Sequence, residues 1–416
     1  MKVTLLNHSD SLGGASVVTY RLMQALRKEG IDVRLLVMSK TGNDENVTPY
    51  HSHRAHKCAF LMERLNIFLR NGLSKANLFK VSTASHGVSL ASHPLIVDAD
   101  VIAINWVNQG MLSLNEIEKI AQLGKPVVWT MHDMWCLTGI CHHALECDRY
   151  KKQCGNCQFI NGGKRKNDLS HSTWLKKQAL YQKTNIQFVA VSNWLANKCK
   201  ESTLLGNKHV EVIHNAFPID SYTTTPTSKV EGYGIDYNKN LILMGAARLD
   251  DPIKGFDYAI EALNIFAERN PDVAKNCEVI FFGDIRNPQL LTKISMPYRH
   301  LGRINDANTI KQLYASAKVV ISTSLYETLP GTLIEGQAAG CVPVSFGKGG
   351  QADIIDHKVT GYIADYKSPQ SIADGIVWAI EASPNREMLH ESVRKKFASQ
   401  VIAQKYIKLF KSLIEK

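Results

Sequence analysis

Residues 319–344, VVISTSLYETLPGTLIEGQAAGCVPV, decide the fold class of this chain. Val319–Ser322 is a short β-branched run, which is typical of a strand buried on both faces of a parallel sheet. Pro330 and Gly331 interrupt the pattern and predict a helix start, so the order is strand, loop, helix, strand. Glu327 then lies on the loop, and Glu335 lies one turn into the helix.

The predicted helix start has the character of an anion site. Its first backbone N–H groups have no intrahelical partner and lie at the carboxyl end of the sheet, where α/β folds bind anions. We expect Pro330, Gly331 and Thr332 to contact the ligand there. Carboxylates repel phosphate but accept hydrogen bonds from hydroxyl groups, so Glu327 and Glu335 suit a ribose or a sugar beside the phosphate. Together these features point to a nucleotide sugar.

Length and composition predict two soluble domains. The 416 residues exceed one ordinary domain, and 44% of them are hydrophobic, which is ample for two cores. No apolar run approaches the roughly 20 residues that span a bilayer, and the N-terminus shows no signal-peptide pattern. We therefore expect a cytoplasmic protein.

The net charge is distributed unevenly. Lys+Arg minus Asp+Glu is 26 − 15 = +11 for residues 1–210 and 23 − 23 = 0 for residues 211–416. This asymmetry indicates either an anionic partner, such as the inner membrane face or a lipid-linked phosphate, or a basic surface kept for solubility. Nucleic acid is disfavoured because the basic residues are scattered and no nucleic-acid module is present.

The first half reads as a β-α-β series. The strand Lys2–Asn7 leads through Gly13 and Gly14 into a helix at Ala15–Lys28. This glycine pair suits a phosphate or sugar site, but it is also typical of a tight turn that needs positive φ. Further buried strands end at Asn105 and Trp106 and at His132, where ligands sit in this fold class. His132 is the candidate catalytic residue of this half.

A cysteine-rich segment follows these strands. We expect Cys141, Cys147, Cys154 and Cys157 to hold a structural zinc ion, with free thiols or disulfides as alternatives. A closed thiolate set leaves no open coordination position, so a catalytic zinc is disfavoured.

A second β-α-β series begins with the strand Asn240–Ala246 and the helix Gly255–Arg269. Arg248 and Lys254 lie in the predicted loop between them. Two cations at the carboxyl end of a strand suit a diphosphate leaving group.

At this point the chain resembles the retaining GT-B glycosyltransferases of family four (glycosyl transferases group 1), typified by capsule, exopolysaccharide and lipopolysaccharide transferases. The resemblance covers nearly the whole chain. It is carried by Gly13-Gly14, His132, Val191-Ser192, Asn215 to Asp220, Arg248, Lys254-Gly255, Gly283, the Glu327 and Glu335 pair, and Gly349-Gly350.

The resemblance implies two facing Rossmann-like domains with parallel sheets. Residues 1–214, joined by a helix at 395–416, would form the acceptor-side domain, and residues 215–394 the nucleotide-sugar domain. It implies that Arg248 and Lys254 bind the diphosphate, that Glu327 holds the donor sugar and that Glu335 holds the ribose. Arg303 would lie near the base. No cofactor is implied for catalysis.

The sequence departs from the family pattern in two places. The Arg248 to Lys254 loop is one residue longer than usual, and Leu329–Thr332 replaces a Phe-Gly-rich run.

The predicted reaction is transfer of a hexose, with retention, from a nucleoside-diphosphate sugar to a saccharide or lipid-linked saccharide acceptor, in bacterial surface polysaccharide synthesis. A nucleotide-sugar epimerase and a non-catalytic sugar-nucleotide-binding protein remain as alternatives.

Overall fold

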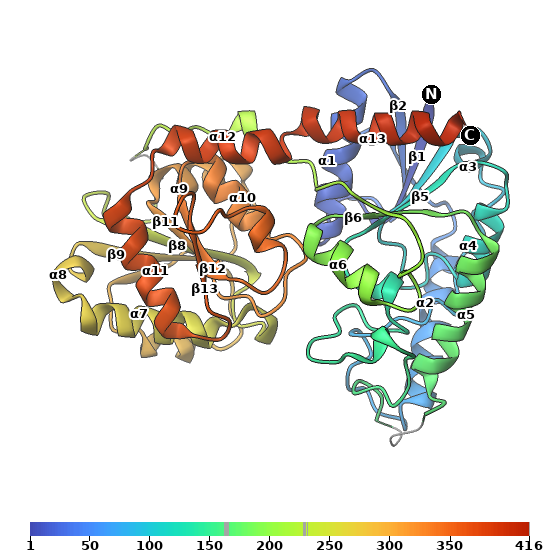
Figure 1. The fold of residues 1–416 in the computed structure, drawn as a ribbon, viewed down its shortest axis with the longest axis horizontal. Helices are drawn as coiled ribbons and strands as arrows, with labels where there is room; N and C mark the ends of the chain where they lie inside the picture. The colour runs from blue at the N-terminus through green and yellow to red at the C-terminus, as the bar shows by residue number, and fades with distance from the viewer. Residues whose placement is uncertain (162–165, 228–229, 231, 416) are drawn as a thin grey trace. The chain divides into compact units, whose positions relative to one another are not determined.

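The computed structural model describes residues 1–161, 166–227, 230 and 232–415, and the chain divides into two compact units (Figure 1). Unit 1 comprises Met1–Ala216 and Ser399–Lys416, and unit 2 comprises Phe217–Ala398. The sequence prediction placed these boundaries after residues 214 and 394. No helix among the described residues is both long and apolar enough to cross a membrane.

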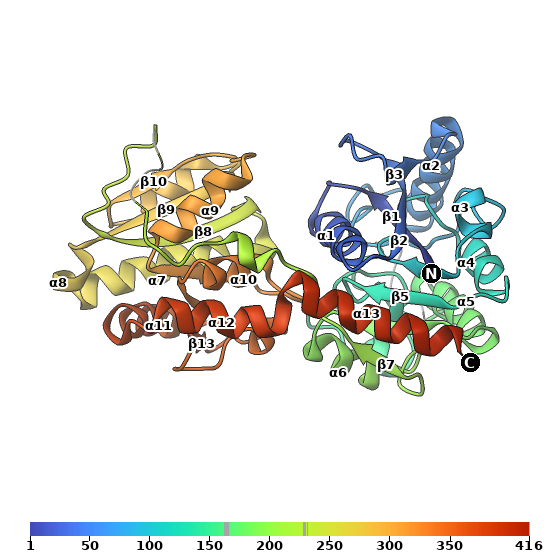
Figure 2. The same cartoon turned by 90° about the horizontal axis from the view of Figure 1, so that it is seen from above.

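Unit 1 is built on a parallel sheet with the strand order β3-β2-β1-β4-β5-β6-β7 (Figure 2). The strands are apolar because helices cover both faces of a parallel sheet. The strands are β1 (Lys2–Ser9), β2 (Asp32–Ser39), β3 (Val47–Pro49), β4 (Val101–Ile104), β5 (Val127–Met131), β6 (Gln187–Ala190) and β7 (Val210–Val212), and the helices are α1 (Gly14–Lys28), α2 (His53–Arg70), α3 (Pro94–Val97), α4 (Leu114–Ala121), α5 (Leu169–Lys183), α6 (Asn193–Glu201) and α13 (Ser399–Ile414).

The last helix of the chain belongs to the core of unit 1. Tyr406 and Phe410 of α13 are almost fully buried with Leu22 and Leu26 of α1. The hydroxyl groups of Tyr406 and Thr130, the latter on β5, lie 2.9 Å apart. Helix α13 therefore covers α1 and the sheet rather than ending the chain as a free tail.

Unit 2 is a second parallel sheet with the strand order β10-β9-β8-β11-β12-β13. The strands are β8 (Asn240–Arg248), β9 (Cys277–Asp284), β10 (Tyr298–His300), β11 (Val319–Ser322), β12 (Val342–Phe346) and β13 (Tyr362–Ala364), and the helices are α7 (Phe256–Arg269), α8 (Pro271–Ala274), α9 (Ala307–Ser316), α10 (Gly331–Ala338), α11 (Pro369–Ala382) and α12 (Arg386–Phe397). Two parallel Rossmann-like sheets confirm the predicted α/β fold class. The opening stretch is β11, a loop, α10 and β12, as predicted.

In both sheets the order in which successive strands are added reverses next to the first strand. In unit 1 the strand order runs outward from β1 on one side and from β4 on the other, and in unit 2 the same holds for β8 and β11. Ligands of open α/β sheets bind at the carboxyl ends of the strands beside such a reversal. The topology therefore marks one candidate position in each unit.

Three predicted segments differ from the structure. Strand β8 runs to Arg248 instead of Ala246, so Arg248 ends a strand and is not part of a loop. The sequence predicts a helix at Cys58–Asn71, whereas α2 begins at His53, because the Ser52 hydroxyl caps it by accepting the Ala55 N–H at 3.3 Å. The short strand β3 was not predicted, since three residues carry too little periodicity to be recognised.

Candidate functional site

In unit 2, the turn that carries Lys254 is fixed against the end of β11. The Thr323 hydroxyl lies 3.1 Å from the Lys254 carbonyl and 2.8 Å from the Gly255 carbonyl. The Leu325 N–H donates to the Ile253 carbonyl at 2.8 Å. Gly255 has φ +61, and a Cβ there would lie 2.3 Å from the Thr323 carbonyl oxygen. Glycine is therefore required, and the close approach brings Lys254 beside the loop that follows β11.

Lys254 and Glu327 form an ion pair at this position. Their Nζ and Oε1 atoms are 2.5 Å apart, and the side chains are 30% and 21% exposed. The charge of Glu327 raises the pKa of Lys254 above its ordinary value, although burial acts in the opposite direction. Lys254 is therefore charged at neutral pH, and both side chains are still reachable by a ligand.

The backbone of Glu327 is fixed by the glycine pair at 349–350. The Gly350 N–H donates to the Glu327 carbonyl at 3.1 Å, and Glu327 and Gly349 form an isolated parallel bridge. Gly349 has φ +146, and a Cβ there would lie 2.1 Å from the Glu327 carbonyl oxygen. The glycine pair thus acts by positioning the carboxylate.

Arg248, at the end of β8, is held by two aspartates. Its Nη2 lies 2.7 Å from an Asp251 carboxylate oxygen, and its Nε lies 3.6 Å from Asp250. Asp250 in turn accepts the Arg286 N–H at 2.8 Å. The Arg248 side chain is 29% exposed, so it is oriented by its partners and remains partly open to solvent.

Helix α10 begins at this same edge of the sheet. Pro330 is its N-cap and supplies no side-chain hydrogen bond to the first turn. Gly331 and Thr332 are the first two helical residues, and Glu335 follows as a half-buried residue one turn later. A Cβ on Gly336 would lie 2.7 Å from the Val320 side chain, so this glycine sets α10 close against β11. The free first turn retains the character of an anion site.

Arg303 lies on the other side of β8, in the segment that follows β10. Its Nη1 is 3.7 Å from Asp284, and both side chains are more than half exposed. The Gly283 N–H donates to the Gly302 carbonyl at 2.7 Å, which ties the Arg303 loop to the end of β9. The structure therefore places Arg303 at the same sheet edge as Arg248, with its charge exposed.

In unit 1, His132 and Asn105 meet at the ends of β5 and β4. His132 Nε2 lies 3.1 Å from Asn105 Oδ1, and the Asn105 amide donates to the Ala103 carbonyl at 3.3 Å. Burial lowers the pKa of His132 to about 4, so the imidazole is neutral at pH 7. A neutral ring donates through Nε2 to the amide oxygen.

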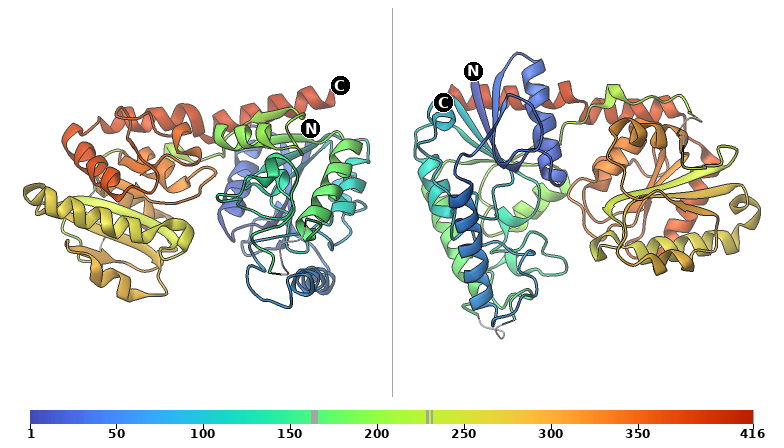
Figure 3. Two further views of the ribbon diagram at one scale, coloured as in Figure 1. Left: turned by 60° about the horizontal axis from the view of Figure 1, so that its bottom comes forward. Right: turned by 180° about the vertical axis from the view of Figure 1, so that it is seen from behind.

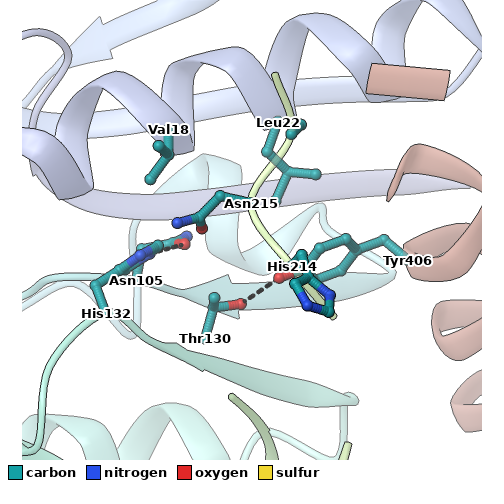
Figure 4. Close-up of a pocket in the computed structure, with 9 residues that line it drawn as sticks. Val18, Leu22, Asn105, Thr130, His132, His214, Asn215 and Tyr406 are labelled. Carbon is teal, nitrogen blue, oxygen red and sulfur yellow. Dashed lines mark hydrogen bonds between the residues drawn. The ribbon is translucent and has the colours of Figure 1, made fainter. Parts of the chain in front are cut away.

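Both residues line a small pocket that lies wholly within unit 1 (Figure 4). The pocket is bounded by α1, by the ends of β4 and β5, by the segment after β7 and by α13. Its lining residues are Val18, Leu22, Asn105, Thr130, His132, His214, Asn215, Ala216 and Tyr406. Asn215 belongs to the motif that carried the family resemblance, and in Figure 4 its side chain reaches toward Asn105 and His132.

Gly13 and Gly14 lie beside this region at the start of α1. Gly13 has φ +87, and a Cβ on either glycine would meet no atom within 4 Å. The helix has no side-chain cap. Neighbouring packing therefore does not demand Gly14, and the pair leaves the start of α1 open. Asn7, at the end of β1, accepts the Trp106 N–H at 2.9 Å, which ties Trp106 to the same strand ends.

Asp133 and His142 form a buried pair that sequence reasoning missed. Their carboxylate and Nδ1 atoms are 2.7 Å apart, and the Trp106 indole N–H donates to the same carboxylate at 3.0 Å. Burial alone would raise the pKa of Asp133, but the charge of His142 and its hydrogen bond bring it down to about 2. His142 is nine residues from Asp133 and 60 residues from its other partner, Ser82. These contacts depend on the course of an irregular segment, for which the sequence has no periodic signal.

The four cysteines of the predicted zinc site are free thiols in the structure. Burial raises the pKa of Cys154 to about 11 and that of Cys157 to about 12. Within the described part of the chain, no group of three or more potential ligands is arranged to hold a metal ion. The zinc site therefore stays a prediction.

The predicted residues thus fall into two sets. The structure joins Lys254 to Glu327 directly and places Arg248, Arg303 and the α10 start at the same sheet edge of unit 2. It joins His132 to Asn105 in unit 1 and ties Trp106 to the strand end that precedes Gly13.

Comparisons with solved structures support the fold. An Anabaena protein, HepE, solved with UDP and glucose, superposes with a TM-score of 0.65 at 18% identity, and the match covers 99% of this chain and 100% of that chain. Sucrose-phosphate synthase from Thermosynechococcus elongatus gives a TM-score of 0.65 at 15% identity, covering 100% and 99%. At these identities the likeness establishes the GT-B fold alone.

Sequence comparisons identify the family. An uncharacterized glycosyltransferase of Methanocaldococcus jannaschii is 31% identical over 39% of this chain and 43% of its own length. A putative colanic acid biosynthesis glycosyl transferase of Escherichia coli is 23% identical over 52% of this chain and 54% of its own length, so the chain spans about half of these relatives. The model for glycosyl transferases group 1 matches residues 228–396, and that for glycosyltransferase family 4 matches residues 12–221. With both halves matched, the chain belongs to the family-four glycosyltransferases of the GT-B fold.

Proposed function

We propose that this glycosyltransferase moves a hexose from a nucleoside-diphosphate sugar to an acceptor hydroxyl with retention of configuration. The observation that carries the proposal is the Lys254–Glu327 ion pair at the reversal of the unit 2 sheet. In this pair a cation that can bind phosphate lies next to a carboxylate that can accept hydrogen bonds from hydroxyl groups.

Lys254 is suited to the diphosphate because its ammonium group has three donors and Glu327 uses one of them. The remaining donors can reach phosphate oxygens while the pair stays intact. Glu327 would use its other oxygen to hold a hydroxyl of the donor sugar. One ion pair would in this way orient both sides of the bond that breaks.

The leaving diphosphate gains negative charge as the glycosidic bond lengthens. Arg248, Lys254 and the uncapped first turn of α10 would stabilise that charge. Arg248 is oriented beforehand by Asp250 and Asp251, so the guanidinium need not be ordered during the reaction. A diphosphate oxygen would take the acceptor proton in a same-face displacement, which retains the anomeric configuration. Activity is therefore expected in the presence of EDTA.

Unit 1 would supply the acceptor side. His132 is neutral and held by Asn105, which suits a hydrogen-bonding contact to a sugar rather than a covalent role. A role in surface polysaccharide synthesis is supported by the name of the Escherichia coli relative. The acceptor would be a saccharide or a lipid-linked saccharide.

A two-stage experiment tests the proposal. A thermal-shift screen against nucleoside-diphosphate sugars should reveal one or more stabilising donors, since a ligand at 100 times its dissociation constant stabilises by about 2.7 kcal/mol. NMR of the product should then show the anomeric configuration of the donor. An inverted product would exclude retention. If the protein binds a donor but shows neither transfer nor slow donor hydrolysis, the non-catalytic alternative is favoured. Interconversion of two sugar nucleotides would favour the epimerase.

A further inference from the structure

Helix α2 exposes an apolar stripe to solvent. Leu61, Met62, Leu65 and Leu69 are 53%, 45%, 48% and 56% exposed. Together with exposed Cys58 they recur at i, i+3, i+4, i+7 and i+11, which is one face of a helix. We call these four apolar residues the outer α2 stripe. Figures 2 and 3 show that α2 lies at the edge of unit 1.

The opposite face of α2 carries two charged residues, Glu63 and Arg64, that are buried in unit 1. Glu63 is fully buried and accepts the backbone N–H groups of Thr83 and Ala84, each at 2.8 Å. Arg64 is paired with Glu63 at 2.9 Å and donates to the Val81 carbonyl at 3.2 Å. The buried face thus holds Glu63 and Arg64 beside the apolar Ala59 and Ile67, whereas a usual surface helix buries apolar residues alone.

The orientation of α2 is fixed by these contacts. Turning the helix to bury the stripe would remove Glu63 and Arg64 from their partners and leave buried backbone groups unsatisfied. The Cβ of a residue at position 110 would also lie 2.5 Å from the Phe60 nitrogen, so Gly110 holds the inner face close to the domain. The packing of α2 therefore keeps the stripe exposed.

Between residues 53 and 97, every exposed lysine, arginine or acidic side chain is a cation. Arg54 and Lys57 flank the start of the stripe, and Arg70, Lys75 and Lys80 follow its end, all of them exposed. The acidic residue of this stretch, Glu63, is buried, and the next acidic residue in the chain is Asp98. Apolar side chains flanked by cations match the boundary between acyl chains and anionic headgroups.

We propose that the outer α2 stripe docks unit 1 on an anionic lipid bilayer, with the leucines inserted at the headgroup boundary and the flanking cations on lipid phosphates. The net charge of +11 in residues 1–210 supports the same orientation by attracting the unit to the surface. This inference goes beyond the proposed reaction and does not rest on it.

Cosedimentation with vesicles tests the docking surface. The wild-type chain should pellet with vesicles of phosphatidylglycerol and phosphatidylcholine and stay in the supernatant with phosphatidylcholine alone. Leu65→Gln/Leu69→Gln should lower the partition coefficient by at least about tenfold because two apolar side chains no longer leave water. Lys57→Gln/Arg70→Gln should lower it about fivefold per cation removed, an effect that high salt abolishes.

Leu175→Gln is the matched control, since Leu175 is 44% exposed on α5 and lies outside the stripe. It should bind vesicles like the wild type. Circular dichroism of each variant checks folding. The proposal is overturned if the wild type ignores anionic vesicles, or if the double leucine variant binds them like the wild type. It is also overturned if the stripe instead joins two copies, seen as a dimer that Leu65→Gln/Leu69→Gln dissociates while vesicle binding persists.

Discussion

At the scale of single residues, the candidate site depends on pairs that come from distant segments. Lys254 meets Glu327, and His132 meets Asn105. Each of these residues was identified from its position at a strand or loop end, but the pairing itself was not. A sequence pattern indicates which sheet edge a residue reaches, whereas its partner depends on which strands become neighbours.

The buried state of His132 predicts a pH dependence of stability. Because its folded pKa is lowered to about 4, the unfolded chain binds more protons between pH 6.5 and 4. The stabilising contribution is therefore complete above about pH 6.5 and is lost progressively as the pH falls toward 4. Urea unfolding of the wild type at pH 7 and pH 5 should differ by a term on the order of 2 kcal/mol from this group. His132→Gln should reduce that difference, and an unchanged difference would contradict the assignment.

The close approach of the Glu327 backbone predicts that position 349 does not tolerate a side chain. A side chain there would collide with the Glu327 carbonyl oxygen and take an unfavourable φ of +146. Gly349→Ala should lower the free energy of unfolding by about 1–3 kcal/mol and also lower turnover by displacing the carboxylate. Gly124→Ala is the control, because Gly124 also has positive φ but no atom lies within 4 Å of its Cβ. Equal effects of the two substitutions would argue against a positioning role.

At the scale of elements, the strand β11 and helix α10 were predictable because their residues are strongly patterned. The stretch 319–344 contains a β-branched run, a Pro-Gly break and a short helix, and the structure follows this order. Helix α2 was predicted with a late start, since its first turn depends on the Ser52 cap rather than on apolar periodicity. The burial of the charged Glu63 on α2 was not predictable, because its partner Thr83 lies 20 residues away.

The two carboxylates around α10 should separate in binding experiments. Glu335 is carried by the helix and is proposed to hold the ribose, so Glu335→Ala should weaken binding of the nucleoside diphosphate. Glu327→Ala should spare that binding and impair transfer, since Glu327 faces the sugar in our proposal. Calorimetric titration of both variants with UDP and other nucleoside diphosphates provides the measurement. The reverse result would assign the ribose to Glu327 and the donor sugar to Glu335.

The C-terminal helix should be essential for unit 1. Phe410 is fully buried against the core, and truncating a buried Phe to Ala costs about 3–5 kcal/mol. Phe410→Ala should therefore lower the midpoint of thermal unfolding markedly. Lys411→Ala changes an exposed neighbour on the same helix and should leave it nearly unchanged. Similar midpoints for both variants would show that α13 contributes little to folding.

At the scale of the whole molecule, the sequence was informative about architecture and less so about chemistry. Two series of strands and helices predicted two parallel sheets, and the structure confirms them. The sugar, the base and the acceptor depend on side-chain contacts to ligands, for which spacing in the chain carries no signal. The cysteine segment shows the same limit, since the spacing of its four thiols does not say whether they bind a metal ion, and the zinc site stays a prediction.

The initial rate of nucleoside-diphosphate release from a panel of sugar nucleotides tests the central claim most directly. The wild type should release the diphosphate from at least one hexose donor in the presence of EDTA. Arg248→Ala and Lys254→Ala should each lower the rate roughly a hundredfold, as expected for the loss of one transition-state donor. Lys318→Ala, a control on a half-buried lysine before β11, should keep the wild-type rate. Unchanged rates in both Arg248→Ala and Lys254→Ala would contradict the assignment of these cations to the leaving diphosphate.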